Sequence, residues 1–380
     1  MKNFQKIRVL ECIRQGQIGG GETHVLNLVA GLNKDIFEPV VLSFTQGAMV
    51  DSLRSMNIRT EVIETEKGFD FSKWKKVKDF IKREEIDIIH AHGTRACSNV
   101  FQPARSLKLP LLYSIHGWSF HQDQNPVVRT VRELSEKFLT DRTSLNINVS
   151  IGNQEEGINR FRLRNSKIVL YGIDTQKFNA FGNYPNIRAE LGIPENKTLV
   201  GYLVRMTKQK DPLTMIKALK LVADVTPDVI LLVVGNGELE TEVKQLVTEL
   251  NLTNQVIFQN FRQDIASILS NLDAYCLPSL WEGMSIGMLE AMTMHKPVIV
   301  TPTDGVPELI TNGKNGLIVP FQDPQALANA ILQVHSQKDL RKSLGENAYQ
   351  TMAANYFLDK MVKNIETLYK SFSNEVIPNI

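Results

Sequence analysis

Short runs of apolar residues alternate with longer amphipathic stretches along this chain. A continuous apolar run of strand length, bounded by turn residues, predicts a strand buried on both faces, as in a parallel sheet. The amphipathic stretches predict helices, for example Glu22–Leu32, Phe71–Glu84 and Val127–Asp141. The predicted strands of the first half are Ile7–Ile13, Val40–Phe44, Arg59–Ile63, Asp87–His92, Leu111–His116, Asn146–Ser150 and Lys167–Tyr171. This alternation predicts the α/β class with parallel sheets.

The alternation pauses once and then starts again. Residues 178–186 are rich in Asn and Gly, show no periodicity and are interpreted as a linker. The predicted strands beyond it are Leu199–Val204, Ile230–Gly235, Val256–Asn260, Ala274–Leu277, Val298–Thr301 and Gly316–Val319. A length of 380 residues also favours two domains. We therefore predict two Rossmann-like domains, residues 1–178 and 179–357, and a final helix with one apolar face within residues 358–380.

The segment 278–292 is the most informative for function. Glu282 follows the predicted strand Ala274–Leu277, and Glu290 lies within the predicted helix Ile286–Met294. Open parallel sheets bind their ligands at the carboxyl ends of the strands. A carboxylate such as that of Glu290 is suited to hold a polyol such as ribose. Backbone amides at the helix start would face an anion; they belong to Ser285, Ile286 and Gly287.

Cations and glycines follow other predicted strands. Arg205 ends a strand and Lys210 opens the next helix, so the two can straddle a diphosphate, with a solvated basic loop as the alternative. Gly19, Gly20 and Gly21 follow the first strand. Glycines at a helix start let the backbone approach a phosphate closely, and a flexible turn is the alternative.

His116 also ends a predicted strand, where it can hydrogen-bond a reacting sugar, although a lone histidine is more often structural. Asp87, His90 and His92 lie close together in the sequence, but strand alternation places only His90 and His92 on one face. These two lack a third obvious ligand, so we predict no metal site.

These motifs together resemble the retaining glycosyltransferases of family 4, which have the GT-B fold. Glu282 and Glu290 match the family's E-x7-E spacing, and Arg205 with Lys210 matches its R-x4-K pair. The glycines at 19–21 match its GGxE turn, His116 its HG context, and residues 258–264, which include Arg262, its F-x-G-x-x-x-D turn. The resemblance implies two domains facing across a cleft, with the C-terminal helix crossing back to the first.

The resemblance also implies an activity. The enzyme would move a hexose or N-acetylhexosamine from a nucleotide diphosphate sugar, UDP-linked, to a hydroxyl of a glycan or lipid-linked acceptor in surface polysaccharide synthesis. The α configuration would be retained by same-face attack, with the leaving phosphate assisting deprotonation of the acceptor. No protein nucleophile, metal or other cofactor is then expected.

The same resemblance assigns the roles of individual residues. The diphosphate would be held by Gly20, Arg205, Lys210 and the amides near Ser285. Glu290 would hold the ribose. Glu282 would meet the sugar hydroxyls, and His116 would meet the sugar from the first domain. Arg262 is expected to bind substrate with the turn that carries it.

Two other functions remain open. An epimerase or a phosphorylase on the same fold would use the same donor site. A non-catalytic sugar-nucleotide binder is suggested by two departures from the family pattern, Tyr171 in place of Asn and Asn260 in place of Gly.

Charge and cysteine content limit the partners. The net charge of +2 argues against a nucleic-acid binder. Residues 1–180 carry 26 Lys and Arg against 20 Asp and Glu, a net of +6. Scattered cysteines, with no signal peptide or spanning segment, predict a cytoplasmic protein with reduced thiols. The helix 71–83 is basic, so weak peripheral contact with the inner membrane face is expected, although its apolar stripe is more typical of core.

Overall fold

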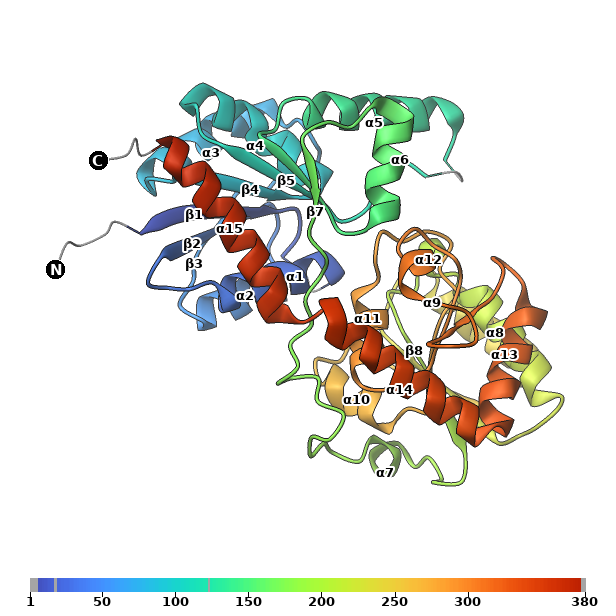
Figure 1. Cartoon of the computed structure of the whole chain (residues 1–380). Coiled ribbons are helices and arrows are strands. Elements are labelled where there is room, and N and C mark those ends of the chain that lie inside the picture. Colours follow the sequence, from blue (N-terminus) through green and yellow to red (C-terminus); the bar gives the residue numbers. More distant parts are fainter. Residues whose placement is uncertain (1–5, 17–18, 122–123, 377–380) are drawn as a thin grey trace. The chain divides into compact units, whose positions relative to one another are not determined.

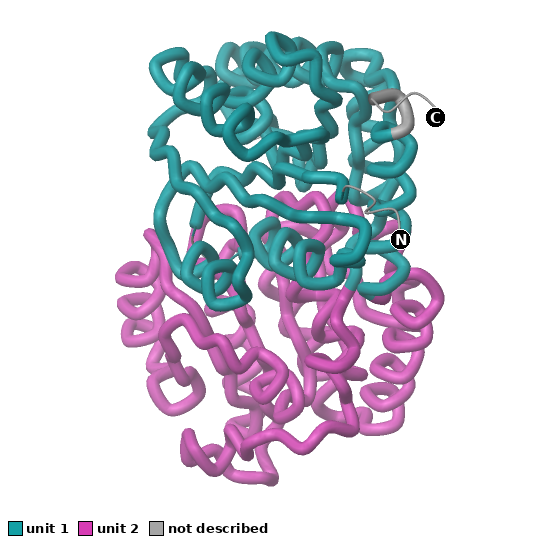
Figure 2. The backbone as a smooth tube through the Cα atoms, turned by 90° about the vertical axis from the view of Figure 1, so that its left-hand side faces the viewer, with its two compact units in different colours: residues 1–172, 358–380 teal, residues 173–357 magenta. Residues whose placement is uncertain are grey.

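The chain forms two compact units in the computed structural model, which describes residues 6–16, 19–121 and 124–376. The first unit joins residues 1–172 to residues 358–380, and the second comprises residues 173–357 (Figure 2). The division falls at Gly172, ahead of the linker at 178–186 that the sequence indicates. Both units are α/β, as predicted, and Figure 1 labels their elements.

The first unit is built on a seven-stranded parallel sheet in the order β3-β2-β1-β4-β5-β6-β7. In the central pair, Val9 of β1 is in register with Ile88 of β4. The strands are β1 (Ile7–Ile13), β2 (Phe37–Ser43), β3 (Arg59–Val62), β4 (Ile88–His92), β5 (Leu111–Ile115), β6 (Leu145–Asn148) and β7 (Ser166–Ile168). Every strand that the pattern predicts in this half is present. The inner strands are mostly buried on both faces, which explains why most of their residues are apolar.

Helices cover both faces of this sheet. They are α1 (Gly20–Gly31), α2 (Ala48–Ser55), α3 (Phe71–Arg83), α4 (Thr94–Leu107), α5 (Pro126–Thr140), α6 (Ile151–Phe161) and α15 (Leu358–Val376). Successive side chains of a strand point to opposite faces. Leu10 of β1 accordingly packs in one core cluster with residues of α3 and α4. Its neighbour Val9 packs in another with residues of α1 and α15.

The C-terminal helix α15 belongs to the first unit, which confirms the predicted return of the chain (Figure 1). Its apolar residues recur at helical spacing, and Met361, Ile365 and Tyr369 lie in the core cluster that covers β1, β4 and β5. Gly172 is required at the approach of this helix, because a Cβ there would lie 2.6 Å from the Leu358 Cα.

The second unit contains a six-stranded parallel sheet in the order β10-β9-β8-β11-β12-β13. The strands are β8 (Thr198–Leu203), β9 (Val229–Val234), β10 (Val256–Gln259), β11 (Ala274–Leu277), β12 (Val298–Val300) and β13 (Leu317–Ile318). Each corresponds to a predicted strand. The predicted linker lies between β7 and the short helix α7 (Ile187–Leu191).

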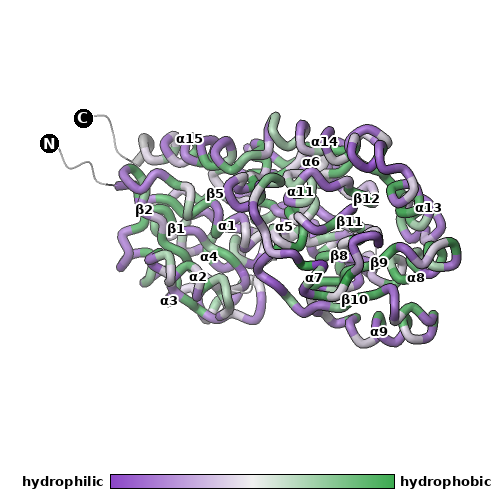
Figure 3. Tube along the Cα trace, turned by 90° about the horizontal axis from the view of Figure 1, so that it is seen from below, coloured by the Kyte–Doolittle hydropathy of each residue, from purple (hydrophilic) through white to green (hydrophobic). Residues whose placement is uncertain are grey.

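Helices surround this second sheet as well. They are α8 (Pro212–Ala223), α9 (Glu240–Glu249), α10 (Ile265–Asn271), α11 (Ile286–Thr293), α12 (Val306–Leu309), α13 (Pro324–Ser336) and α14 (Lys338–Asn355). Helix α8 packs against α13, and α11 packs against α14. Hydrophobic and hydrophilic stretches alternate along such helices in Figure 3, as expected when one face lies on a core. Within the described ranges, no helix is long and apolar enough to cross a membrane.

Candidate functional site

Three of the predicted site residues lie at the carboxyl ends of β8 and β11. Arg205 follows β8 and is exposed, whereas Lys210 is half-buried at the end of a short 3-10 helix, Lys208–Lys210. The Lys210 ammonium forms an ion pair with Glu282, which follows β11. The Ser279 hydroxyl also donates to Glu282, over 2.9 Å, and the Tyr202 hydroxyl donates to the Lys210 carbonyl oxygen over 2.7 Å. The structure therefore brings together a lysine and a glutamate that are 72 positions apart.

Helix α11 begins close to this ion pair. Ser285 caps it, and the Ser285 hydroxyl accepts a hydrogen bond from the Met288 amide over 3.4 Å. Gly287 is required in the first turn, because a Cβ there would lie 2.8 Å from the Tyr275 hydroxyl oxygen. That hydroxyl in turn contacts the Leu203 carbonyl oxygen at 3.4 Å, at the end of β8. The first amides of α11, which lack partners within the helix, thus lie near the loop that carries Arg205.

Glu290 lies in α11 and is buried. Burial raises its pKa to about 7, and the attraction of Lys177 offsets this rise only in part. A buried carboxyl group with a strongly raised pKa is expensive to keep charged, which is typical of functional positions. Glu290 is therefore a candidate functional group of this unit.

Two glycines bring the turn after β9 against the loop after β8. Gly235 has a φ of +125°, and a Cβ there would lie 2.1 Å from the Val204 carbonyl oxygen. A Cβ at Gly237 would lie 2.3 Å from the Met206 carbonyl oxygen. Beside this turn lies a pocket of about 300 Å³. It is lined by Met206, Gly235, Glu240, Lys244, Phe258, Gln259 and Asn260.

Asn260, which replaces the glycine of the family turn, takes part in the wall of this pocket. Its side-chain oxygen accepts from the Asn236 amide nitrogen over 2.9 Å, and the Phe261 backbone amide donates to the Asn236 side-chain oxygen over 3.0 Å. The two asparagines therefore tie the turns after β9 and β10 together. Asn260 supports the pocket, so its departure from the family pattern does not remove the binding surface.

Arg262, a predicted binding residue, has carboxylate partners in the structure. Its guanidinium donates to Asp264 over 2.9 and 2.7 Å and to Glu190 over 3.1 Å. These hydrogen bonds raise the Arg262 pKa. Bidentate pairing of a guanidinium with carboxylates is strong, so these bonds stabilise the loop. A role of Arg262 in binding substrate would require it to exchange one of these partners, and that role stays a prediction.

In the first unit, Gly19 caps helix α1 with an extended backbone, and the helix begins at Gly20. The sequence predicts this helix two residues later, at Glu22. A Cβ at Gly21 would make an ordinary contact of 3.7 Å with the His116 ring. The three glycines therefore lie at a helix N-terminus beside His116, where an anion is favoured.

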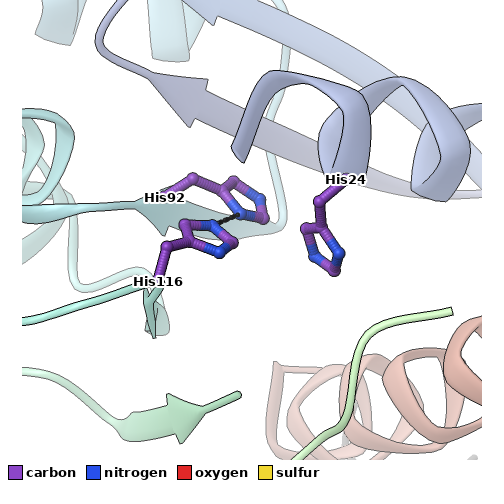
Figure 4. Close-up of side chains that lie close together, drawn as sticks. All are labelled: His24, His92 and His116. Atoms are coloured by element: carbon purple, nitrogen blue, oxygen red, sulfur yellow. Dashed lines mark hydrogen bonds between the residues drawn. The ribbon is translucent and has the colours of Figure 1, made fainter. Parts of the chain in front are cut away.

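His116 follows β5, and both of its ring nitrogens have partners within the first unit. Nδ1 lies 2.6 Å from the Tyr171 hydroxyl, and Nε2 lies 3.0 Å from Nδ1 of His92 (Figure 4). Burial, together with the neighbouring His92 and His90, holds the His116 pKa well below its usual value. His116 is thus a neutral imidazole, and it must exchange one of its two partners before it can bind a sugar hydroxyl.

A buried glutamate stands at the other end of this hydrogen-bonded chain. The Glu11 carboxylate accepts from His92 Nε2 over 2.8 Å and from the Tyr369 hydroxyl over 2.6 Å. Burial alone would raise the Glu11 pKa, but the attraction of His90 and hydrogen bonds from His90 and His92 outweigh burial and lower it. Since the ionised Glu11 fixes the proton of His92 on Nε2, His92 accepts from His116, and His116 accepts from Tyr171.

His24, on α1, completes a cluster of three histidines, although the sequence singles it out for no function. Its ring lies 5.1 Å from that of His116 and 5.5 Å from that of His92 (Figure 4). Its Nε2 is buried without a hydrogen-bond partner. One ligand atom from each of these histidines lies within 4.8 Å of the others, and Glu11, His90 and His92 form a second such group. Among the described residues, these two clusters are where a metal ion could be held.

Sequence spacing could not reveal these two clusters, because their members come from β1, α1, β4 and the end of β5. The signal that was available is topological. Glu11, His90, His92 and His116 lie in a strand or directly after one, His24 lies on the helix that follows β1, and the carboxyl ends of parallel strands meet at one edge of the sheet.

Tyr369→Phe tests the contribution of this network to stability. The substitution keeps the ring in the core but removes a donor to the buried Glu11 and a partner of His90, whose Nδ1 lies 2.6 Å away. We expect the free energy of unfolding to fall by about 1–3 kcal/mol. Urea denaturation measures the change. Tyr349→Phe is the matched control, because it removes the hydroxyl of another tyrosine whose ring stacks on a histidine, His295. An equal fall in the free energy of unfolding there would contradict the stabilising role of the Tyr369 hydroxyl.

Comparison with known proteins agrees with the geometry. Residues 183–351 match the family model of glycosyl transferases group 1, and residues 18–177 match that of glycosyltransferase family 4. The UDP-Gal:α-D-GlcNAc-diphosphoundecaprenol α-1,3-galactosyltransferase of Escherichia coli is 28% identical over 296 residues, 76% of each chain. The putative glycosyltransferase EpsD of Bacillus subtilis is 25% identical over 330 residues, 85% of this chain and 86% of the relative.

Solved structures share the fold. The crystal structure of Anabaena Alr3699/HepE in complex with UDP and glucose superposes with a TM-score of 0.85 at 24% identity. The superposition covers 96% of this chain and 100% of that one. The GT-B fold expected from the sequence is thereby confirmed.

Proposed function

Because the chain belongs to the family 4, group 1 glycosyltransferases, we propose that it moves a hexose or N-acetylhexosamine from a UDP-linked sugar to a hydroxyl of a glycan or lipid-linked acceptor, with retention of the α configuration. The observation that carries this proposal is the Lys210–Glu282 ion pair beside the exposed Arg205 and the start of α11. In this proposal, the cations and the amides of α11 stabilise the negative charge that develops on the departing diphosphate.

The second unit holds the donor in this proposal. Arg205, Lys210 and the first amides of α11 bind the diphosphate. Glu290 accepts hydrogen bonds from the ribose hydroxyls, and Glu282, fixed by Lys210 and Ser279, meets the hydroxyls of the sugar. The pocket of about 300 Å³ beside Gly235 takes the nucleobase, against Phe258 and Lys244.

The reaction needs no covalent step on the protein. The acceptor oxygen bonds to the anomeric carbon as the bond from that carbon to the diphosphate oxygen breaks, and the acceptor proton passes to the departing diphosphate. Lys210 and Arg205 stabilise the negative charge that forms on it. His116 binds the transferred sugar after exchanging a partner.

The acceptor is proposed to be lipid-linked. The Escherichia coli relative is described as acting on a diphosphoundecaprenol-linked sugar, and a lipopolysaccharide core mannosyltransferase of Rhizobium meliloti is 25% identical over 211 residues, 54% of this chain and 60% of the relative. These relatives support a glycan acceptor that grows on a lipid.

The proposal is tested by incubating the chain with a panel of UDP- and GDP-sugars and an isoprenoid-diphosphate-linked N-acetylglucosamine, with and without EDTA. Mass spectrometry should show transfer from one UDP-sugar at equal rates in both conditions. Transfer that EDTA abolishes would contradict the metal-independent mechanism and point to the histidine cluster. Donor conversion without acceptor would indicate an epimerase, phosphate-dependent cleavage a phosphorylase, and binding without turnover a non-catalytic binder.

A further inference from the structure

Helix α5 (Pro126–Thr140) has a second apolar face that points to solvent. Val127, Val131 and Leu134 are exposed to 71%, 61% and 61%, and Phe138 to 37%. These positions follow one another at helical spacing and so form one stripe. A stripe of this kind on a surface helix marks an interaction site, because the outer face of such a helix is normally polar.

The opposite face of α5 is anchored in the first unit. Glu136 is fully buried and accepts from the Thr94 hydroxyl over 2.6 Å and from the Tyr113 hydroxyl over 2.9 Å. Leu139 lies in the core cluster of the sheet. Since the inner face is fixed by these contacts, α5 cannot turn its outer stripe inward.

Basic residues flank the stripe on a hollow of about 430 Å³ between α5 and the end of α6. The hollow is lined by Thr130, Glu133, Leu134, Lys137, Arg160, Phe161, Arg162 and Arg164. Lys137 pairs with Asp141, and Arg160 pairs with Glu133 and Glu156. Arg162 and Arg164 are exposed and form no ion pair with any residue that the structure describes. The stripe therefore borders two uncompensated cations.

A further arginine borders the C-terminal end of the stripe. The Arg142 guanidinium carbon lies 3.6 Å from the centre of the Phe138 ring. Such stacking holds the cation over an exposed aromatic residue and leaves its outer side accessible.

We propose that this face of α5 docks on an anionic lipid bilayer. Val127, Val131, Leu134 and Phe138 enter the interface, and Arg162 and Arg164 bind headgroup phosphates. Apolar side chains beside exposed arginines fit a surface that offers acyl chains next to negative charge. The inference goes beyond the proposed function, because lipid binding requires neither donor nor acceptor.

The proposed docking face lies on α5, whereas the charge pattern of the sequence indicates α3. In α3, Val77, Phe80 and Ile81 lie in the core, and Trp74 packs against them. Phe71, at 70%, is the exposed large apolar residue of this helix. The lysines of α3 therefore offer charge without an apolar face to insert, and charge alone gives weaker attachment.

Cosedimentation of the full chain with vesicles tests the proposal. Vesicles of phosphatidylglycerol and phosphatidylcholine should bind the protein at low salt, and pure phosphatidylcholine should bind it weakly. The double variant Val131→Asp with Leu134→Asp should lower the bound fraction about 10-fold or more. Arg162→Asn with Arg164→Gln should weaken binding to the anionic vesicles selectively.

The matched control is Lys75→Gln with Lys76→Gln, which removes the same two charges from α3. Binding that stays near the wild-type level in this control supports α5 as the docking face. The proposal is wrong if the wild type fails to bind anionic vesicles, or if the α3 variant loses as much binding as the α5 variants. It is also wrong if the chain dimerises through α5, which sedimentation of the protein alone would show as a dimer that Leu134→Asp dissociates. Unchanged melting temperatures confirm that each variant is folded.

Discussion

Lys210→Ala is expected to lower turnover by about 10²-fold or more, because it removes a fixed cation from the place where the diphosphate charge develops. The Tyr202 hydroxyl holds the Lys210 backbone and Glu282 holds its ammonium, so the cation is in place before the donor binds. Arg205→Ala should have a similar effect. Steady-state kinetics with the donor identified by the panel measures both.

The two cations should not act independently. If Arg205 and Lys210 serve one diphosphate, the double variant should lose less than the product of the two single effects. Lys217→Ala, an exposed lysine of α8, makes the same charge change away from the site and should leave turnover unchanged. Normal turnover in Lys210→Ala would remove this residue from the donor site.

Glu290→Gln should weaken donor binding while stabilising the protein without donor. The amide keeps the shape of the carboxylate but offers one acceptor oxygen in place of two. The KM for the donor is expected to rise by about 10-fold or more, since hydrogen bonds to a charged group are lost. If Glu290 had a purely structural role in α11, its substitution would not both weaken donor binding and stabilise the fold.

The stability gain depends on pH in a defined direction. In the folded protein burial raises the Glu290 pKa to about 7 from its ordinary value of 4.5. Below pH 4.5 the carboxyl group is protonated in both the folded and the unfolded state, so it does not lower the stability of the fold. Between these values the unfolded chain releases the proton first, so folding stability declines as pH rises, and above pH 7 the full cost of about 3 kcal/mol remains. Glutamine removes this cost.

Thermal melts at pH 8 and pH 5.5 measure the effect. Glu290→Gln should melt well above the wild type at pH 8 and only slightly above it at pH 5.5. Glu242→Gln, at an exposed position of α9, should melt like the wild type at both values. A variant that is less stable than the wild type at pH 8 would show that the ionised Glu290 supports the fold.

Most of the fold could be predicted because buried parallel strands leave a simple signal. Strand β11 is apolar throughout, and β1 is mostly apolar; their observed limits, Ala274–Leu277 and Ile7–Ile13, are those that the sequence predicts. Short edge strands are less certain. The observed β7 covers Ser166–Ile168 where the sequence predicts Lys167–Tyr171, because one neighbouring strand imposes fewer constraints on its ends.

The donor-side residues Glu282, Arg205 and Lys210 could be proposed because each follows a strand or opens a helix, and Glu290 because it lies in the helix that follows Glu282. The histidine network could not, since its hydrogen bonds join Glu11, His92 and Tyr369 across 358 positions of sequence. The partners of Arg262 were equally hidden: Glu190 is 72 positions away, so no local pattern shows that the guanidinium has a carboxylate partner there.

The most direct test of the central claim is the anomeric configuration of the transferred sugar. The product of the donor panel is analysed by proton NMR, starting from an α-linked UDP-sugar. We predict a new glycosidic bond with the small anomeric coupling of an α linkage, formed in the presence of EDTA. A β-linked product, or no transfer from any donor of the panel, would contradict the assignment of this chain as a retaining glycosyltransferase.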